Sequence, residues 1–199
     1  MSLDRRELLQ LLAASPLPAL IGLPPAAIER AVRATRETRG PDQGAYEPRF
    51  FTPVEWRTVG VLADLIVPRD ERSGSATDAA VPQFIDYVLA EWPDNQTPVR
   101  GGLAWLDREC RERFGTPFVE CSAGQQTQLL DLIAYPKKAP PEMSQGVAFF
   151  NRFRDLVLSG FWSSKMGVED LQYMGNTFVE EWKGCPEGVT RKIGVGYGR

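Results

Sequence analysis

The chain of 199 residues contains no histidine. Histidine is the usual general base near neutral pH, the partner of serine and cysteine nucleophiles, and the most common metal ligand in proteins. Its absence excludes Ser-His-Asp and Cys-His catalysis by this chain, and it excludes axial histidine ligation of haem. Chemistry based on carboxylates or on lysine stays open.

Cysteine is also scarce, since only Cys110, Cys121 and Cys185 are present and no two of them form a C-x-x-C pair. This spacing gives no support to a zinc or iron–sulfur site. The sequence has no G-x-G-x-x-G loop, so binding of FAD by this chain alone is not expected. The formal net charge of −3 and the pI of about 5.2 leave no basic surplus that would indicate nucleic acid as a partner.

The N-terminus carries an arginine pair, Arg5-Arg6, followed by an apolar run over residues 8–23. A run of 16 residues that contains prolines is shorter than the about 20 residues of a transmembrane helix. The pattern resembles a twin-arginine export signal, although Asp4 and Gln10 depart from its usual flanking residues. An ordinary amphipathic N-terminal helix is the alternative interpretation.

No clear A-x-A cleavage site follows the apolar run, and Pro24-Pro25-Ala26-Ala27 is the nearest candidate. This leaves open an uncleaved signal, or export together with a partner. We therefore expect residues 1–25 to form a twin-arginine-like signal segment. The protein would then be periplasmic, or associated with the periplasmic side of a membrane without a span of its own.

The central part of the sequence predicts an all-α domain of about five helices over residues 50–162, because its apolar residues recur at helical spacing. Two capping boxes mark helix starts, Thr52 with Glu55 and Ser122 with Gln125. Gly115 is expected to end the third helix. We find no convincing strand and no internal repeat.

The two flanks of this domain differ in composition. Residues 26–49 combine a short arginine-rich helix with a Pro/Gly-rich linker, and residues 163–199 form an irregular tail. Aromatic side chains in such a tail need a surface on which to pack, so we expect a partner contact there. We expect the segment from residue 161 to 173 to be ordered by the helical domain. The candidate partner contacts are Phe161, Trp162, Tyr173, Phe178 and Trp182.

Three aspartates on successive predicted helices, Asp64, Asp86 and Asp107, could form a metal or acid–base cluster. The alternative, which is more common, is that they are solvated or cap neighbouring turns. Similarly, the aromatic clusters at residues 149–153 and 161–162 could line a cofactor pocket, but side chains at this spacing more often belong to a core.

The cysteines leave two alternatives open. Cys185 lies between Gly184 and Pro186, and it is either a free thiol or a disulfide partner, with another chain in an oxidising compartment as one candidate for the bond. Cys110 and Cys121 could form a disulfide with each other, or Cys110 could act as a small buried hydrophobic residue.

Several segments over residues 50–186 resemble, in order and spacing, the gluconate 2-dehydrogenase subunit 3 family. Residues 63–68 are similar to its AD-x-I-I-P segment and residues 80–86 to its AGV-x-x-FID segment. The segments that carry the resemblance are Phe51-Thr52-Pro53 with Glu55, Ala63–Pro68, Ala80–Asp86, Gly102–Asp107, Phe114–Phe118, Ser122 with Gln125-Gln126, and Phe149-Phe150 leading to Leu158–Ser163.

The resemblance implies a non-catalytic accessory subunit without a cofactor or catalytic residues of its own. Its partner would be an FAD-dependent flavoprotein of the glucose-methanol-choline type that oxidises a sugar or sugar acid, and a cytochrome c subunit could accept the electrons. The small subunit would fold, stabilise and co-export this flavoprotein. The alternatives are a free-standing periplasmic helical binding module and an independent carboxylate-based enzyme.

Overall fold

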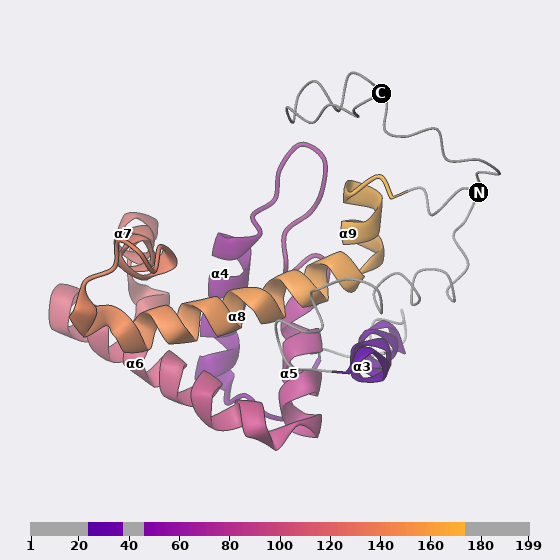
Figure 1. The fold of residues 1–199 in the computed structure, drawn as a ribbon, viewed down its shortest axis with the longest axis horizontal. Helices are drawn as coiled ribbons and strands as arrows, with labels where there is room; N and C mark the ends of the chain where they lie inside the picture. The colour runs from indigo at the N-terminus through magenta and orange to yellow at the C-terminus, as the bar shows by residue number, and fades with distance from the viewer. Residues whose placement is uncertain (1–23, 38–45, 174–199) are drawn as a thin grey trace, which may run out of the picture.

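The computed structural model describes residues 24–37 and 46–173, and within these ranges it contains α-helices and short 3-10 turns but no strand (Figure 1). The predicted all-α class is therefore confirmed. The five predicted helices are α4 to α8, and α3 and α9 flank them. The α-helices are α3 (Pro25–Glu37), α4 (Pro53–Ile66), α5 (Val81–Glu91), α6 (Gln96–Phe114), α7 (Ala123–Ala134), α8 (Ser144–Ser163) and α9 (Lys165–Asp170).

Local signals in the sequence set the helix ends. Thr52 Oγ1 accepts a hydrogen bond from the backbone N–H of Glu55 at 3.3 Å, and the Glu55 carboxylate accepts one from the Thr52 N–H at 2.8 Å. Ser122 and Gln125 form the same reciprocal capping box at the start of α7. Gly115 ends α6 with φ of 81°, in the left-handed region that glycine adopts without steric cost.

Helix α8 is the centre of the domain, because it contacts α3, α4, α5, α6, α7 and α9. In Figure 1 it crosses α4 and α5 and extends from α7 to α9. Its side chains Phe149, Phe153, Val157 and Phe161 recur every four residues and are all buried. Of the aromatic residues that could have lined a cofactor pocket, the phenylalanines at 149, 150, 153 and 161 are thus core residues, and Trp162 is partly buried against the core. None of the helices in the described ranges has the length and hydropathy of a membrane span.

Helices α6 and α8 approach closely at two glycines. A Cβ atom on Gly102 of α6 would lie 1.9 Å from Cδ2 of Phe149, and one on Gly146 of α8 would lie 2.2 Å from Cη2 of Trp105. Each helix therefore places an aromatic ring over a glycine of the other helix. Within each helix the glycine and the ring are three residues apart, so both lie on the facing surface.

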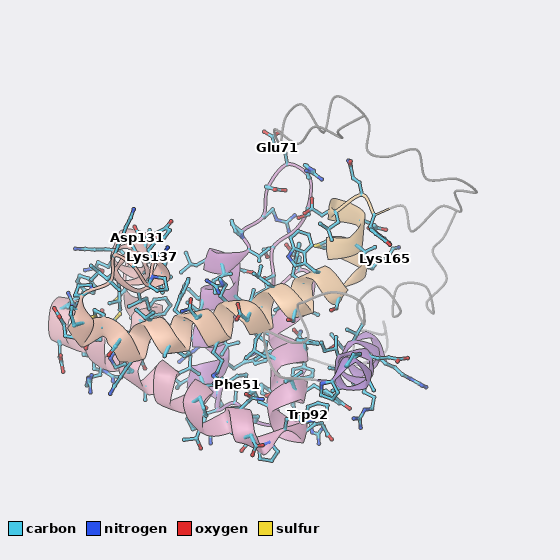
Figure 2. All side chains as sticks on the ribbon, viewed as in Figure 1. Phe51, Glu71, Trp92, Asp131, Lys137 and Lys165 are labelled. Atoms are coloured by element: carbon cyan, nitrogen blue, oxygen red, sulfur yellow. The ribbon has the colours of Figure 1, made fainter. Side chains whose placement is uncertain are left out.

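The core extends beyond the expected range of residues 50–162 at its N-terminal end. Ala27, Ile28, Ala31 and Val32 of α3 are buried and belong to the same apolar cluster as the central helices. Helix α3 packs on α5 and α8. Trp92 lies at the end of α5 near α3 (Figure 2), and the Arg30 guanidinium lies 5.4 Å from the centroid of its ring.

The packing of α3 also bears on the candidate cleavage stretch. Residues 24–27 lie at the start of this helix, and the side chain of Ala27 is fully buried. A protease needs an accessible backbone without competing hydrogen bonds, so cleavage within this stretch would require α3 to unfold locally.

At the other end of the domain, α9 lies within the expected irregular tail and is helical.

Candidate functional site

The three predicted aspartates do not converge on one site. Asp64, Asp86 and Asp107 each accept hydrogen bonds from a different connecting segment. Within the described part of the chain, no group of three or more cysteine, aspartate and glutamate side chains could hold a metal ion. The more common of the two alternatives, in which these residues cap neighbouring turns, is the one found.

Asp86 of α5 is fully buried and accepts four hydrogen bonds. Its Oδ1 accepts from the backbone N–H groups of Phe50 (3.0 Å) and Phe51 (3.1 Å). Its Oδ2 accepts from the backbone N–H of Arg49 (2.8 Å) and from the Tyr46 hydroxyl (2.7 Å). These donors all belong to residues 46–51, which we call the lead-in to α4.

This arrangement explains how a carboxylate is accommodated in the core. An ionised carboxylate has about four lone-pair sites, and the four donors of the lead-in occupy them. Three consecutive backbone N–H groups directed at one carboxylate form a concave anion-binding site of the kind that backbone turns make elsewhere. Because an unpaired buried charge is strongly unfavourable, the lead-in and Asp86 depend on each other.

Arg100 of α6 holds the same lead-in from its other side. Its Nη2 donates to the carbonyl oxygen of Phe50 at 2.8 Å, and its Nε pairs with Glu55 at 3.1 Å. Its guanidinium also lies 4.3 Å from the centroid of the Phe50 ring. The ring of Tyr46 stacks on Trp56 with centroids 5.3 Å apart. The lead-in is therefore fixed by α4, α5 and α6 together.

The phenol of Tyr46 is strongly perturbed by this environment. Burial, then the hydrogen bond to Asp86, then the negative charge of Asp86 hold the pKa of Tyr46 well above its usual range, and the nearby Arg49 opposes this in part. The neutral phenol that donates to Asp86 is therefore the stable form in the folded protein.

Substitution of Tyr46 by Phe should lower the free energy of unfolding by about 1–2 kcal/mol at pH 7, because it removes a hydrogen bond to a charged group. A tyrosine of the unfolded chain loses its proton near pH 10. Since the folded pKa is higher, this contact contributes fully below about pH 10 and less as the pH rises above it. Urea unfolding between pH 8 and 11 should show a steeper loss of stability in the wild type than in Tyr46→Phe.

The exposed Tyr135 provides the matched control for this titration. Tyr135→Phe should keep the alkaline profile of the wild type. Equal slopes for the wild type and Tyr46→Phe would contradict the assignment.

Asp64 of α4 holds the loop between α4 and α5, whose tip is marked by Glu71 in Figure 2. Its two carboxylate oxygens accept from the backbone N–H and the hydroxyl of Thr77, both at 2.8 Å. Within the loop, Asp78 accepts from the Ser75 N–H at 2.7 Å and pairs with Arg69 at 2.6 Å. The Asp64 carboxylate thus fixes the turn that precedes α5.

Asp107 of α6 holds the turn before α7. It accepts from the backbone N–H of Phe118 at 3.0 Å. The carbonyl oxygen of Phe118 accepts a hydrogen bond from the side-chain amide of Gln126 at 2.9 Å. Phe118 is fully buried, so its two backbone polar groups need these partners. Sequence reasoning gave no role to Gln126, although a buried polar residue on the apolar face of α7 was a usable signal.

Cys110 and Cys121 are both buried and both thiols are free in the structure. Burial, followed by the neighbouring Cys121, raises the pKa of Cys110 to about 12, and the charge of Arg113 opposes the effect. Cys185 lies outside the described residues.

The candidate partner contacts differ in their exposure. Phe161 is only 1% exposed and packs edge-on against Trp162 with centroids 5.0 Å apart, so it is a core residue and cannot be a surface contact. Trp162 and Tyr173 are partly exposed and stay predictions. The candidate contacts Phe178 and Trp182 and the signal pair Arg5-Arg6 lie outside the described ranges.

A cavity of about 90 Å³ lies where α3, the start of α5, the end of α8 and α9 meet. It is lined mainly by apolar side chains, with Thr35, Ser164 and Lys165 among its residues. Cofactor and ligand sites usually measure roughly 300–1,000 Å³, so this cavity is small for a site of that kind.

The described residues define a helical domain whose most distinctive polar groups hold its own connecting segments in place. The family model for gluconate 2-dehydrogenase subunit 3 matches residues 53–182, and the chain belongs to this family. The family is thus that of a subunit of a dehydrogenase complex. No curated protein and no solved structure gives a match to this chain.

Proposed function

We propose that this chain is a non-catalytic accessory subunit that folds, stabilises and co-exports an FAD-dependent oxidoreductase of the glucose-methanol-choline type. The substrate of that partner would be a sugar or sugar acid, FAD would be bound by the partner, and a cytochrome c subunit would accept the electrons. The observation that supports this most directly is the use of Asp64, Asp86 and Asp107. These motif aspartates hold loops of the chain itself.

The geometry of the aspartates argues against the carboxylate-enzyme alternative. A general base must reach the proton that it removes, at a heavy-atom distance of roughly 2.6–3.2 Å. Both oxygens of Asp86 are already occupied by donors of the lead-in, and both oxygens of Asp64 by Thr77. To act on a substrate, these two carboxylates would have to break the hydrogen bonds that hold the connecting segments in place.

The partner contact is proposed at the end of the described domain around α9. Leu171 is 55% exposed, and Trp162 and Tyr173 are partly exposed nearby in the sequence. Phe178 and Trp182 come later in the sequence. Aromatic residues are enriched in the buried centres of protein interfaces, which favours this end of the chain as the surface that meets the flavoprotein.

Co-expression tests the proposal. A flavoprotein of this type encoded beside the gene should be recovered with bound FAD, dye-reducing dehydrogenase activity and periplasmic location only when this chain is present. We expect at least a tenfold loss of all three when it is omitted. An active and correctly exported flavoprotein obtained without this chain would disprove the role.

A second variant separates export from folding. Replacement of Arg5 and Arg6 by Lys should leave the active complex in the cytoplasm, because the proposed signal is lost while the helical domain is intact. A complex that still reaches the periplasm would reject the export signal and leave the folding role in place.

A further inference from the structure

Helix α9 is ordered although it adds little to the apolar core. It has six residues, Lys165–Asp170, and Gly167 is the only one of them that is buried. An isolated helix shorter than about 12 residues is unstable in water, so contacts with the rest of the domain must hold α9 in place. Given the proposed function, on which this assignment rests, we propose that Arg72 is a positioning residue for the partner contact around α9.

The start of α9 is fixed to the end of α8. Ser164 Oγ accepts a hydrogen bond from the N–H of Gly167 at 3.0 Å and donates one to the carbonyl oxygen of Phe161 at 2.7 Å. A Cβ atom on Gly167 would lie 2.1 Å from the same carbonyl oxygen, so the two helices meet here without room for a side chain. These contacts fix the first turn of α9 and do not reach its C-terminal end.

The C-terminal end of α9 is a Schellman motif. The N–H of Gln172 donates to the carbonyl oxygen of Glu169 at 3.0 Å, and the N–H of Tyr173 donates to the carbonyl oxygen of Val168 at 3.4 Å. Gln172 has φ of 51°, in the left-handed region that favours glycine. Because a Cβ atom makes this conformation unfavourable, the motif closes the helix less firmly than it would with glycine.

Arg72, in the loop between α4 and α5, contacts this end of the helix. Its Nη2 donates to the carbonyl oxygen of Asp170 and also pairs with the Asp170 carboxylate at 3.3 Å. The last carbonyl groups of a helix have no partner within the helix, so a donor placed here stabilises the final turn. Arg72 and Asp170 are 98 residues apart in the sequence. Asp170 directly precedes the exposed Leu171, which belongs to the proposed partner contact.

The loop between α4 and α5 is shaped so that it presents Arg72 to α9. The Asp70 carboxylate accepts hydrogen bonds from the backbone N–H groups of Arg72 and Ser73, both at 2.8 Å. Further along the loop, a Cβ atom on Gly74 would lie 2.9 Å from the sulfur of Met166 in α9. In Figure 1 the loop rises beside α9. The loop therefore supports α9 at two points, one of them at its C-terminal end.

An ordinary surface ion pair is the alternative role for Arg72. Its side chain is 61% exposed, and exposed ion pairs contribute little to global stability. The hydrogen bond to the backbone carbonyl of Asp170, however, acts on the conformation of α9 itself. A partner that meets a preformed surface does not have to order that surface on binding. Arg72 can therefore strengthen partner binding without touching the partner.

Hydrogen exchange of the free full-length chain measures the positioning. Arg72→Ala should speed exchange about threefold at the amides of Val168 and Leu171, which donate within the turns of α9. The midpoint of thermal unfolding should stay within about 2 °C of the wild type. Arg69→Ala is the matched control, because Arg69 lies in the same loop but pairs with Asp78 inside it. Equal exchange of α9 in the wild type and in Arg72→Ala would overturn the assignment.

Binding to the FAD-loaded flavoprotein of the co-expression experiment gives a second measurement. The apparent affinity falls with the fraction of molecules in which α9 is in place, so Arg72→Ala should raise the dissociation constant about threefold. Gln172→Gly favours the left-handed conformation at the end of α9 and should slow its exchange. Combined with Arg72→Ala, it should restore most of the wild-type affinity.

The possible results separate the roles of Arg72. An unchanged dissociation constant in Arg72→Ala, together with faster exchange, would show that α9 is not part of the partner contact. An increase that Gln172→Gly does not reverse would make Arg72 a direct contact rather than a positioning residue. A wild-type chain that binds no flavoprotein would overturn the proposed function and the partner contact with it, whereas the exchange measurement would still show whether Arg72 holds α9.

Discussion

Replacement of Asp86 by Ala should lower the free energy of unfolding by about 4 kcal/mol, which is the range found when one partner of a buried charged network is removed. The variant leaves the backbone N–H groups of Arg49, Phe50 and Phe51 and the Tyr46 hydroxyl without their acceptor. Each buried donor without a partner costs about 1–3 kcal/mol, although partial access of water will reduce the sum. Urea unfolding followed by circular dichroism measures the loss.

Two further variants test the origin of this effect. Asp86→Asn keeps the shape of the side chain, but one of the two acceptor oxygens becomes an NH₂ group that can only donate. We therefore expect an intermediate loss in the free energy of unfolding of about 2 kcal/mol. Asp131→Ala is the control, because Asp131 is exposed on the outer side of α7 (Figure 2), and such surface changes usually stay within about 0.5 kcal/mol. A loss below 1 kcal/mol for Asp86→Ala would show that the lead-in is not an integral part of the fold.

The coupling between Asp86 and Tyr46 should be visible in a double-mutant cycle. Once Asp86 is replaced by Ala, the further change Tyr46→Phe should cost much less than it does in the wild type, because the acceptor has already been lost. The steep alkaline loss of stability should disappear as well.

Gly102→Ala should destabilise the protein by about 3 kcal/mol, because overpacking of a filled interface displaces the residues that it meets. The new Cβ would lie 1.9 Å from Cδ2 and 2.2 Å from Cγ of Phe149, whose ring is only 4% exposed. The ring cannot move outward without opening the contact between α6 and α8. Thermal and urea unfolding measure the effect.

The neighbouring Gly101 gives a matched control with the opposite sign. Gly101 is exposed on the same helix, and a Cβ placed there would meet no atom within 4 Å. Because alanine favours a helix over glycine by about 1 kcal/mol, Gly101→Ala should stabilise. Two adjacent glycines should thus respond in opposite directions, and a stabilising Gly102→Ala would refute the packing assignment. Combining Gly102→Ala with Phe149→Leu should restore part of the loss.

The sequence was a good guide to features that depend on residues close together in the chain. Both capping boxes and the glycine that ends α6 were predicted, because these signals involve partners no more than a few residues apart. The apolar periodicity likewise predicted the five central helices. These features establish the all-α class.

Features that depend on distant contacts could not be predicted. Asp86 binds donors 35 to 40 residues earlier in the chain, and no periodicity indicates which backbone a carboxylate will meet. The contacts of Gly102 and Gly146 depend on which helices become neighbours. Helix α3 was expected outside the domain, because its arginines dominate the pattern, whereas its small residues Ala27 and Ala31 are the ones that pack.

Ala80 adopts a backbone conformation that its residue type does not favour. It has φ of 60°, in the left-handed region. For a residue with a Cβ atom this conformation costs roughly 1–2 kcal/mol. The backbone of the turn before α5 therefore keeps the geometry that a glycine would favour, although this chain has alanine there.

The docking of α3 has a consequence for the order in which the molecule matures. The surface on which α3 packs is built from α5 and α8, which are synthesised later, so α3 cannot take its place until most of the chain has emerged and condensed. Residues 1–23 are attached directly to this helix. For the proposed export role, this order means that the helix next to the Arg5-Arg6 segment docks only after the core is complete. A docked α3 would then distinguish a finished molecule from an unfinished one.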